Sequence, residues 1–254
     1  DLHLSIRRQR QMCIRDRLVG GAESVVRGSV SLGKKLKISL FAIGVVVVAA
    51  GTSLPELASC VRSVVSGHPD IAMGAIIGSN IAYVILIMGA TALLCPIRKI
   101  TQNQVNQAAI NVTIALGLIM MSLLVMQFSP IFGVVSLILL TLIMVYQIKI
   151  GSLNFSDIEE KGEYPMFISV VLIFIGILLL VYGSKFFVNG AVNIATTYSI
   201  PESVIGVSLV AFGTSLPELA VGVLSAVRKK VDFALGNVLG SNIYNILGLS
   251  LIHI

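Results

Sequence analysis

The chain has 254 residues, of which 56% are hydrophobic and only 12% are charged. Soluble domains carry about 25% charged residues, so this composition excludes an ordinary soluble domain and is typical of an integral membrane protein. The net charge of +6 does not indicate nucleic-acid binding, because the basic residues lie in short loops between apolar stretches, as in the cytoplasmic loops of membrane proteins. The three cysteines are scattered without metal-binding spacing and are predicted to be free thiols.

The N-terminal end does not fit the remainder of the chain. Residues 1–17 are too charged for a membrane helix and lack the apolar centre of a signal peptide. We interpret them as a foreign or mis-assembled end. From Leu18 to about Lys37 the sequence predicts the tail of a helix that leads into a basic loop containing Lys34, Lys35 and Lys37.

Apolar segments make up most of the chain after Lys37. A membrane-spanning helix needs about 20 largely apolar residues, and these segments are long enough. They cover residues 38–66, 71–95, 105–126, 130–149, 166–197, 200–227 and 232–254. Residues 150–164 form a polar, acidic linker between two halves, residues 18–149 and residues 165–254. Because the last segment is still apolar at Ile254, we expect the second half to be truncated in its third helix.

The two halves share a repeat. The same eight residues, Gly-Thr-Ser-Leu-Pro-Glu-Leu-Ala, occupy positions 51–58 and 213–220, and at this offset residues 21–86 align with residues 183–248 without a gap. A second polar block, Gly-Ser-Asn-Ile, recurs at 78–81 and 240–243. Apolar composition does not explain the matches, since they include Thr, Ser, Pro, Glu, Asp and Asn. Self-similarity of this kind indicates an internally repeated architecture.

The number of crossings predicts how the two copies are oriented. Five crossings separate them, an odd number, so the copies run in opposite directions through the membrane. Inverted repeats with interrupted helices are typical of secondary transporters. The loop charges predict which side is cytoplasmic, because only Arg62 lies on the other side. The residues on the basic side are Lys34, Lys35, Lys37, Arg98, Lys99, Lys149, Lys161, Arg228, Lys229 and Lys230.

Each copy of the eight-residue motif places a carboxylate, Glu56 or Glu218, inside an apolar segment. An ionisable group at this depth is costly, which indicates a functional site. A proline precedes each glutamate, and because it has no amide hydrogen, we expect carbonyls of 49–52 and 211–214 to lack helical partners. Hydroxyls three and four residues before each glutamate share its helical face. They belong to Thr52, Ser53, Thr214 and Ser215.

These groups predict an oxygen-only site, which suits calcium, magnesium, manganese or sodium rather than zinc or copper. The second block adds Ser79 and Ser241, with Asn245 on the same helical face as Ser241 and Tyr83 at the equivalent place in the first half. Two carboxylates match one divalent cation or two or more monovalent ones. Small polar residues of this block also fit helix packing, as do the glycine pairs of both halves, which have GxxxG spacing.

At these residues the chain resembles the sodium/calcium exchanger family of the calcium:cation antiporters, in its prokaryotic form. The resemblance covers Leu18 to the end. It implies an all-α integral membrane fold of ten helices in two inverted five-helix halves, of which about seven to eight are represented here. It also implies alternating-access exchange of calcium for sodium across the cytoplasmic (inner) membrane, with residues 150–164 on the cytoplasmic side. The transported ions and membrane lipid are then the partners, no cofactor or enzymatic activity is expected, and a monomer is compatible with the sequence.

The resemblance further implies the ion ligands. Glu56 and Glu218 become the central carboxylates, and Tyr83 stands where family members usually have Asn. Asn245 stands where they have Asp or Asn. The implied hydroxyl ligands are Ser53, Ser79, Ser215 and Ser241, and the implied backbone carbonyl ligands are those of Ala49, Thr52, Ala211 and Thr214.

Other functions stay open at this point. The calcium/proton branch has Asn where Thr52 and Thr214 stand, which favours sodium coupling, but proton- or potassium-coupled exchange remains an alternative. A passive cation channel is another. A membrane-embedded enzyme using the paired glutamates for acid–base chemistry is disfavoured, because the sequence offers neither a nucleophile–base pair nor a phosphate-binding loop.

Overall fold

The computed structural model describes residues 2–67, 69–97, 100–124, 130–153, 155, 164–198 and 211–248. All the regular secondary structure in these ranges is helical. Within these ranges, three helices are long and apolar enough to cross a membrane, and a bent pair adds a fourth. The segments predicted at 105–126 and 200–227 lie only partly within the described residues.

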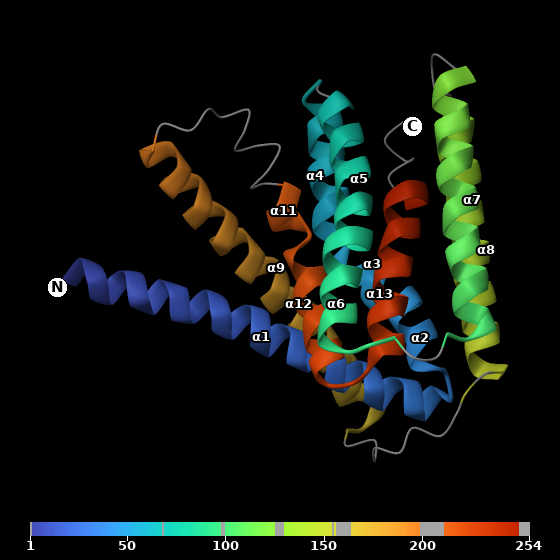
Figure 1. Ribbon diagram of the computed structural model, residues 1–254, viewed down its shortest axis with the longest axis horizontal. Coiled ribbons are helices and arrows are strands. Elements are labelled where there is room, and N and C mark those ends of the chain that lie inside the picture. The colour runs from blue at the N-terminus through green and yellow to red at the C-terminus, as the bar shows by residue number, and fades with distance from the viewer. Residues whose placement is uncertain are drawn as a thin grey trace.

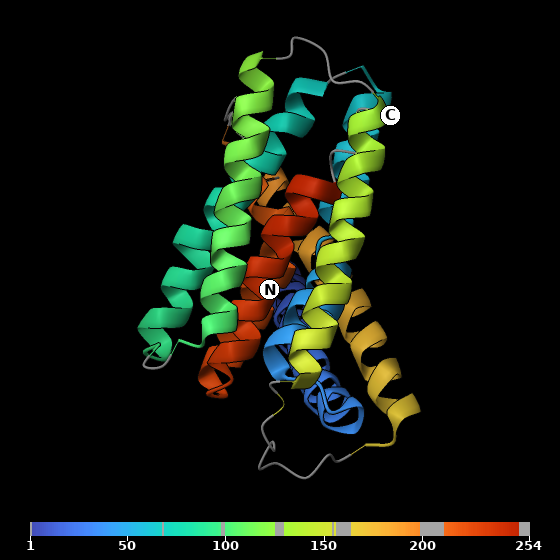
Figure 2. The same ribbon diagram turned by 90° about the vertical axis from the view of Figure 1, so that its right-hand side faces the viewer.

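In the first half, the segment predicted at 38–66 is a broken helix that bends by 42°. The helices of this half are α1 (Leu2–Leu36), α2 (Leu40–Ile43), η1 (Gly44–Val48), α3 (Ala49–Thr52), α4 (Leu54–Val65), α5 (Pro69–Ala82), η2 (Tyr83–Met88), α6 (Gly89–Leu94), α7 (Gln102–Leu124) and α8 (Pro130–Leu153). Figure 2 shows α7 and α8 standing as long, nearly upright helices in front of the remaining bundle.

The second half repeats the interrupted pattern as far as it is described. Its helices are α9 (Met166–Thr197), α11 (Ala211–Thr214), α12 (Leu216–Val227), α13 (Val231–Ile243) and η4 (Tyr244–Gly248). The predicted acidic linker lies mostly outside the described residues, as does the end of the last predicted segment after Gly248. Cys60 and Cys95 are free, as predicted, and the side chain of Cys13 is not among those described.

Two sequence predictions near basic residues need correction. Helix α1 runs without a break from Leu2 to Leu36, so the helix whose tail was predicted from Leu18 to about Lys37 begins within residues 1–17. Lys34 and Lys35 lie in its last turn rather than in a loop, where cations interact favourably with the helix dipole. The count of basic residues omitted Lys185, an exposed residue of α9 whose Nζ lies 5.9 Å from the ring centre of Tyr182.

Helices α1 and α9 pack against each other in antiparallel fashion through glycines (Figure 1). A Cβ atom built on Gly21 lies 2.8 Å from the carbonyl oxygen of Gly176, and one on Gly28 lies 2.7 Å from that of Ser169. Small residues allow helix backbones to approach this closely in membranes. The absence of side chains at these positions therefore sets the distance between the two helices.

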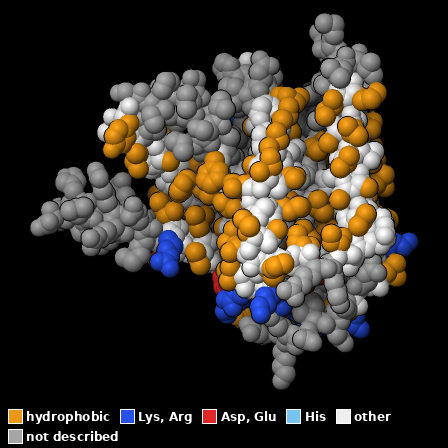
Figure 3. Space-filling view, in the orientation of Figure 1, with side chains coloured by type: hydrophobic (Ala, Val, Ile, Leu, Met, Phe, Trp, Pro, Cys, Tyr) orange, Lys and Arg blue, Asp and Glu red, His pale blue; other side chains and the backbone are white. Residues whose placement is uncertain are grey.

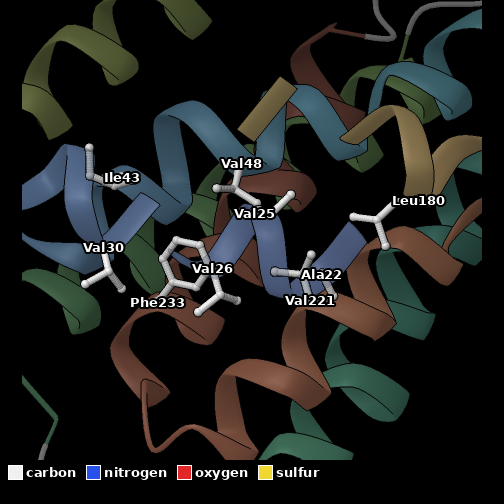
Figure 4. Packing of buried hydrophobic residues seen from close by; sticks show 9 residues of the cluster. All are labelled: Ala22, Val25, Val26, Val30, Ile43, Val48, Leu180, Val221 and Phe233. Carbon is white, nitrogen blue, oxygen red and sulfur yellow. The ribbon is translucent and has the colours of Figure 1, made fainter. Parts of the chain in front are cut away.

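The core lies where α1, α2, η1, α9, α12 and α13 meet, and Figure 4 shows its nine buried apolar side chains. They are Ala22, Val25, Val26, Val30, Ile43, Val48, Leu180, Val221 and Phe233. Outside this core the surface is largely apolar, and several Lys and Arg side chains gather toward the lower end of the face in Figure 3. That distribution fits a body embedded in lipid with one basic end.

The two GxxxG pairs differ in their surroundings. A Cβ atom on Gly236 collides with the carbonyl oxygen of Phe41, and one on Gly240 lies 2.7 Å from that of Val45, so α13 packs closely on α2 and η1. Gly74 and Gly78, their repeat equivalents on α5, have no neighbour within 4 Å among the described residues. The packing interpretation is therefore confirmed for the second pair only.

This difference predicts opposite effects of one substitution at two equivalent positions. Gly236→Ala forces α13 away from the backbone of Phe41, and we expect it to lower the free energy of unfolding by about 1–3 kcal/mol. Gly74→Ala is expected to be neutral or stabilising, because Ala favours a helix by about 1 kcal/mol over Gly. Thermal unfolding in detergent, followed by size-exclusion chromatography, measures both. Equal melting temperatures would contradict the assigned packing.

Candidate cation site

Two helix breaks, at Ser53 and Ser215, position the central residues of the site. Each break falls between a short helix ending in Gly-Thr and a longer helix beginning with Leu-Pro-Glu. Proline is well tolerated in a first helical turn, and the identical sequences fold alike. Glu56 and Glu218 consequently lie in the first turns of α4 and α12, where the helix dipole favours a negative charge.

The two broken helices run in opposite directions (Figure 1). The chain rises from α2 to α4 and descends from α11 into α12. The following helices are also opposed, since α5 and α6 descend and α13 rises. These directions agree with the odd number of crossings counted in the sequence.

A hydrogen bond between the repeats brings the two motifs together. The hydroxyl of Ser53 donates to Oε1 of Glu218 over 3.4 Å. Ser215 lies beside Glu56, although its Oγ has no hydrogen-bond partner. Glu56 is 4% exposed and Glu218 is fully buried, and the two carboxylates are close enough to repel each other. The structure thus brings Glu56 and Glu218 close to each other.

Tyr83 of η2 and Asn245 of η4 join the same cluster. Tyr83 donates its hydroxyl hydrogen to Oε1 of Glu56 over 3.1 Å, and Nδ2 of Asn245 donates to the Tyr83 oxygen over 3.4 Å. Ser79 and Ser241 are buried. Tyr83 and Asn245 lie in π-helical turns, which occur frequently at functional sites.

Several oxygens of this cluster are buried without a hydrogen-bond partner. They are Oε2 of Glu56, Oε2 of Glu218, Oγ of Ser215 and Oδ1 of Asn245. Most buried polar side-chain atoms in proteins are hydrogen-bonded, so four unpartnered oxygens around two carboxylates need an explanation. Oxygens of this kind are suitable ligands for a hard cation. The described residues contain no group of three His, Cys, Asp or Glu side chains suited to a metal.

The predicted carbonyl ligands are only partly as expected. The carbonyl of Ala49 keeps a helical partner, since it accepts the Ser53 N–H over 3.0 Å, so the prediction that it is left free was wrong. The reason is geometric, because Pro55 removes the donor that would reach Gly51, four residues earlier. The Thr52 hydroxyl donates to the Val48 carbonyl over 3.0 Å. Thr214 is half-buried, and Ala211 begins α11.

Two residues near the site escaped the sequence analysis. The hydroxyl of Ser184 on α9 donates to the Gly213 carbonyl, the group that Pro217 deprives of a helical donor. Asn237 on α13 is fully buried, and its side-chain amide lies 3.5 Å from the Thr52 hydroxyl oxygen. Neither residue is repeated, since the equivalent positions hold Ala22 and Ala75. Their only signal was a polar residue in an apolar helix.

The fold matches that of solved transporter structures. A structure of the sodium-calcium exchanger NCX_Mj soaked with sodium and strontium gives a TM-score of 0.84 at 35% identity, covering 96% of this chain and 80% of that chain. The protein is therefore an all-α membrane transporter and not an enzyme. The family model described as "Sodium/calcium exchanger protein" matches residues 17–149 and 168–252. The chain belongs to the sodium/calcium exchanger family.

Similar proteins come from archaea and bacteria. The sodium/calcium exchanger MaX1 of Methanosarcina acetivorans is 32% identical over 285 residues, covering 92% of this chain and 79% of the relative. The putative antiporter CaxA of Alkalimonas amylolytica is 34% identical over 239 residues, covering 91% and 75%. An uncharacterized membrane protein, MJ0091 of Methanocaldococcus jannaschii, is 36% identical over 230 residues, covering 90% and 74%.

The Ser184 bond predicts a stability cost at the second helix break. Ser184→Ala leaves the buried Gly213 carbonyl without its donor, and we expect a loss of about 1–3 kcal/mol in the free energy of unfolding. Thr113→Ala is the control, because its exposed hydroxyl donates to the Ala109 carbonyl within an unbroken helix. Thermal unfolding in detergent compares the two variants. A Ser184→Ala melting temperature no lower than that of Thr113→Ala would argue against this role.

Proposed function

We propose that the protein exchanges calcium for sodium by alternating access, with one ion site shared by the two repeats. The observation that carries the proposal is the cross-repeat cluster around Glu56 and Glu218. Ser53 of one motif hydrogen-bonds the carboxylate of the other, and each carboxylate keeps one buried oxygen without a partner. A site built by two oppositely oriented repeats suits a carrier, because either repeat can move relative to the other to open one side.

The proposed ligands are the oxygens that this cluster gathers. Glu56 and Glu218 supply the negative charge, and Ser53, Ser79, Ser215, Ser241 and Asn245 supply neutral oxygens. The carbonyls of Thr52, Ala211 and Thr214 complete the proposed set, and that of Ala49, which already accepts the Ser53 N–H, joins it only through its second lone pair. Carboxylate, hydroxyl, amide and carbonyl oxygens are ligands that calcium accepts in flexible geometry. An empty site would leave two buried carboxylates repelling each other, so the carrier is expected to change sides mainly when it is loaded.

We further propose that the protein lies in the cytoplasmic membrane with residues 150–164 on the cytoplasmic side. The basic residues at one end of the bundle support this orientation. A relative from Escherichia coli that is 29% identical over 241 residues is named as an inner membrane protein, YrbG. Membrane lipid would then cover the apolar surface.

Potassium-coupled calcium exchange is an alternative function that a specific observation favours. A human protein named sodium/potassium/calcium exchanger 5 is 42% identical over 55 residues, or 22% of this chain. Proton coupling is the remaining alternative within the same class. The three carriers differ in which cation must be present on the opposite side of the membrane.

Removing one carboxylate tests the shared site. In proteoliposomes carrying the full-length protein, Glu218→Gln is expected to abolish uptake of radiolabelled calcium driven by a sodium gradient, because half of the site charge is lost. Asp232→Asn is the control, since Asp232 is exposed and hydrogen-bonds Gln104 at the start of α13. Unchanged calcium flux in the Glu218→Gln variant would refute the proposed site.

Exchanging the counter-ion tests the coupling. We expect calcium uptake to stop when sodium inside the vesicles is replaced by choline and to persist when potassium is omitted from both sides. Uptake that needs potassium, or that follows a proton gradient without sodium, would assign the protein to one of the alternatives.

A further inference from the structure

Asn237 on α13 is a buried polar residue that the proposed ligand set does not use. Its side chain is fully buried, and the equivalent position in the first repeat holds Ala75. Because residues four apart are neighbours on a helix, Asn237 lies on the same face of α13 as Ser241, one turn closer to the start of the helix. An amide at this place therefore needs a partner inside the protein.

The backbone of α13 packs directly against the broken helix of the first repeat. A Cβ atom on Gly44 would lie 2.9 Å from the backbone nitrogen of Asn237, and one on Gly240 would lie 2.7 Å from the Cβ atom of Ala49. Gly44 begins η1 and Ala49 begins α3, the two short helices before the break at Ser53. Asn237 thus lies in a close contact between the two repeats.

The side chain of Asn237 meets Thr52, the last residue of α3, over 3.5 Å. Oγ1 of Thr52 also lies 3.0 Å from the carbonyl oxygen of Val48 and 3.5 Å from that of Ala49, and it lies beside Glu218. Both carbonyls and an ionised carboxylate are acceptors. A hydroxyl has a single hydrogen, so Thr52 cannot donate to all of them at once.

Of the four groups around Thr52 Oγ1, only the Asn237 amide carries hydrogens to donate. With Oδ1 turned toward Thr52, Nδ2 of Asn237 has no partner. The two ends of an amide have nearly the same shape and are told apart by their hydrogen bonds. Nδ2 directed at Thr52 Oγ1 gives both groups a partner, whichever acceptor takes the hydroxyl hydrogen. We therefore assign Asn237 as the donor.

This contact favours one position of the Thr52 side chain. In a helix, threonine divides between two χ1 rotamers, because its hydroxyl can bond a carbonyl three or four residues earlier. A donor from α13 stabilises the rotamer observed here. Since Thr52 directly precedes the break and lies beside Glu218, holding its side chain also holds the end of α3 next to that carboxylate.

We infer that Asn237 is a positioning residue of the cation site, which donates a hydrogen bond to Thr52 and so holds the end of α3 ready for a cation. The inference rests on the proposed function, because the Thr52 carbonyl belongs to the proposed ligand set. A ligand group that is already in place reduces the ordering cost of binding. At the second break the equivalent contact cannot form, since Ala75 stands in place of Asn237. The structural alternative is that Asn237 only packs α13 against α3.

Calcium binding to the purified full-length protein tests the inference without requiring exchange. Asn237→Ala removes the donor, and we expect the Kd for calcium, measured by isothermal titration calorimetry in detergent, to rise about three- to tenfold, the range of one hydrogen bond. In proteoliposomes, half-maximal sodium-driven uptake should need correspondingly more calcium. The maximal rate at saturating calcium should be unchanged, as for a loss of binding alone.

Asn111→Ala is the matched control. Asn111 is a buried amide on α7 whose Nδ2 donates to the Leu239 carbonyl of the same helix, α13, over 3.1 Å. Melting temperatures of both variants report the loss of packing, and only Asn237→Ala is expected to weaken calcium binding. Equal calcium affinities of the two variants would identify Asn237 as a packing residue and overturn the inference.

A double-mutant cycle tests whether Asn237 acts through Thr52. Thr52→Val removes the hydroxyl and keeps the backbone carbonyl, so we expect it to raise the Kd for calcium. Asn237→Ala should add little in that background, because its hydrogen bond is already lost. Effects that multiply would show that the two residues act independently and overturn the assignment. An unchanged Kd in Thr52→Val would also overturn it, even where Asn237→Ala cannot be purified.

The same measurements separate the inference from the proposed function. Wild-type protein that binds calcium but shows no sodium-driven uptake would overturn the proposed exchange, and the binding data would still decide the role of Asn237. Absence of calcium binding to the wild-type protein would overturn both.

Discussion

Burial of Glu56 and Glu218 together is the constraint on which the rest of the structure depends. A single charged side chain inside a membrane protein is costly, and two that face each other are costlier. The fold meets this demand with groups that favour negative charge at each carboxylate. Both glutamates lie in the first turn of a helix, and each accepts a hydroxyl hydrogen, from Tyr83 or from Ser53. Each helix is broken just before its glutamate, because only the start of a new helix provides a first turn at that depth.

The same constraint explains why the bundle is closely packed around the breaks. A helix that stops and restarts exposes backbone groups, which must be buried in protein at membrane depth. Glycine makes that burial possible, since a Cβ atom on Gly51 or Gly213 would collide with Ile177 or Val188 of α9. Helix α9 thus passes both breaks. Helix α1, its antiparallel partner, is tied to α12 by the ion pair of Glu23 with Arg228 at 2.5 Å, an exposed contact of small energetic value.

Repetition made the centre of this site predictable from the sequence alone. Glu56 and Glu218 were identified because identical polar motifs recur in apolar segments, and the odd number of crossings gave their opposite directions. Unrepeated features could not be found in this way. Ser184 and Asn237 face alanine equivalents in the other half, and which carbonyl Ser184 reaches depends on how α9 crosses α11. The length of α1 and the helical partner of the Ala49 carbonyl are likewise matters of backbone geometry that composition does not reveal.

Symmetry and asymmetry therefore have separate consequences in this protein. Residues shared by both repeats, Glu56 with Glu218 and Ser53 with Ser215, lie in the oxygen cluster, and the broken helices that carry them run in opposite directions (Figure 1). The two repeats also differ within this cluster. Tyr83 opposite Asn245 is such a difference, with its hydroxyl hydrogen directed to the carboxylate of the first repeat.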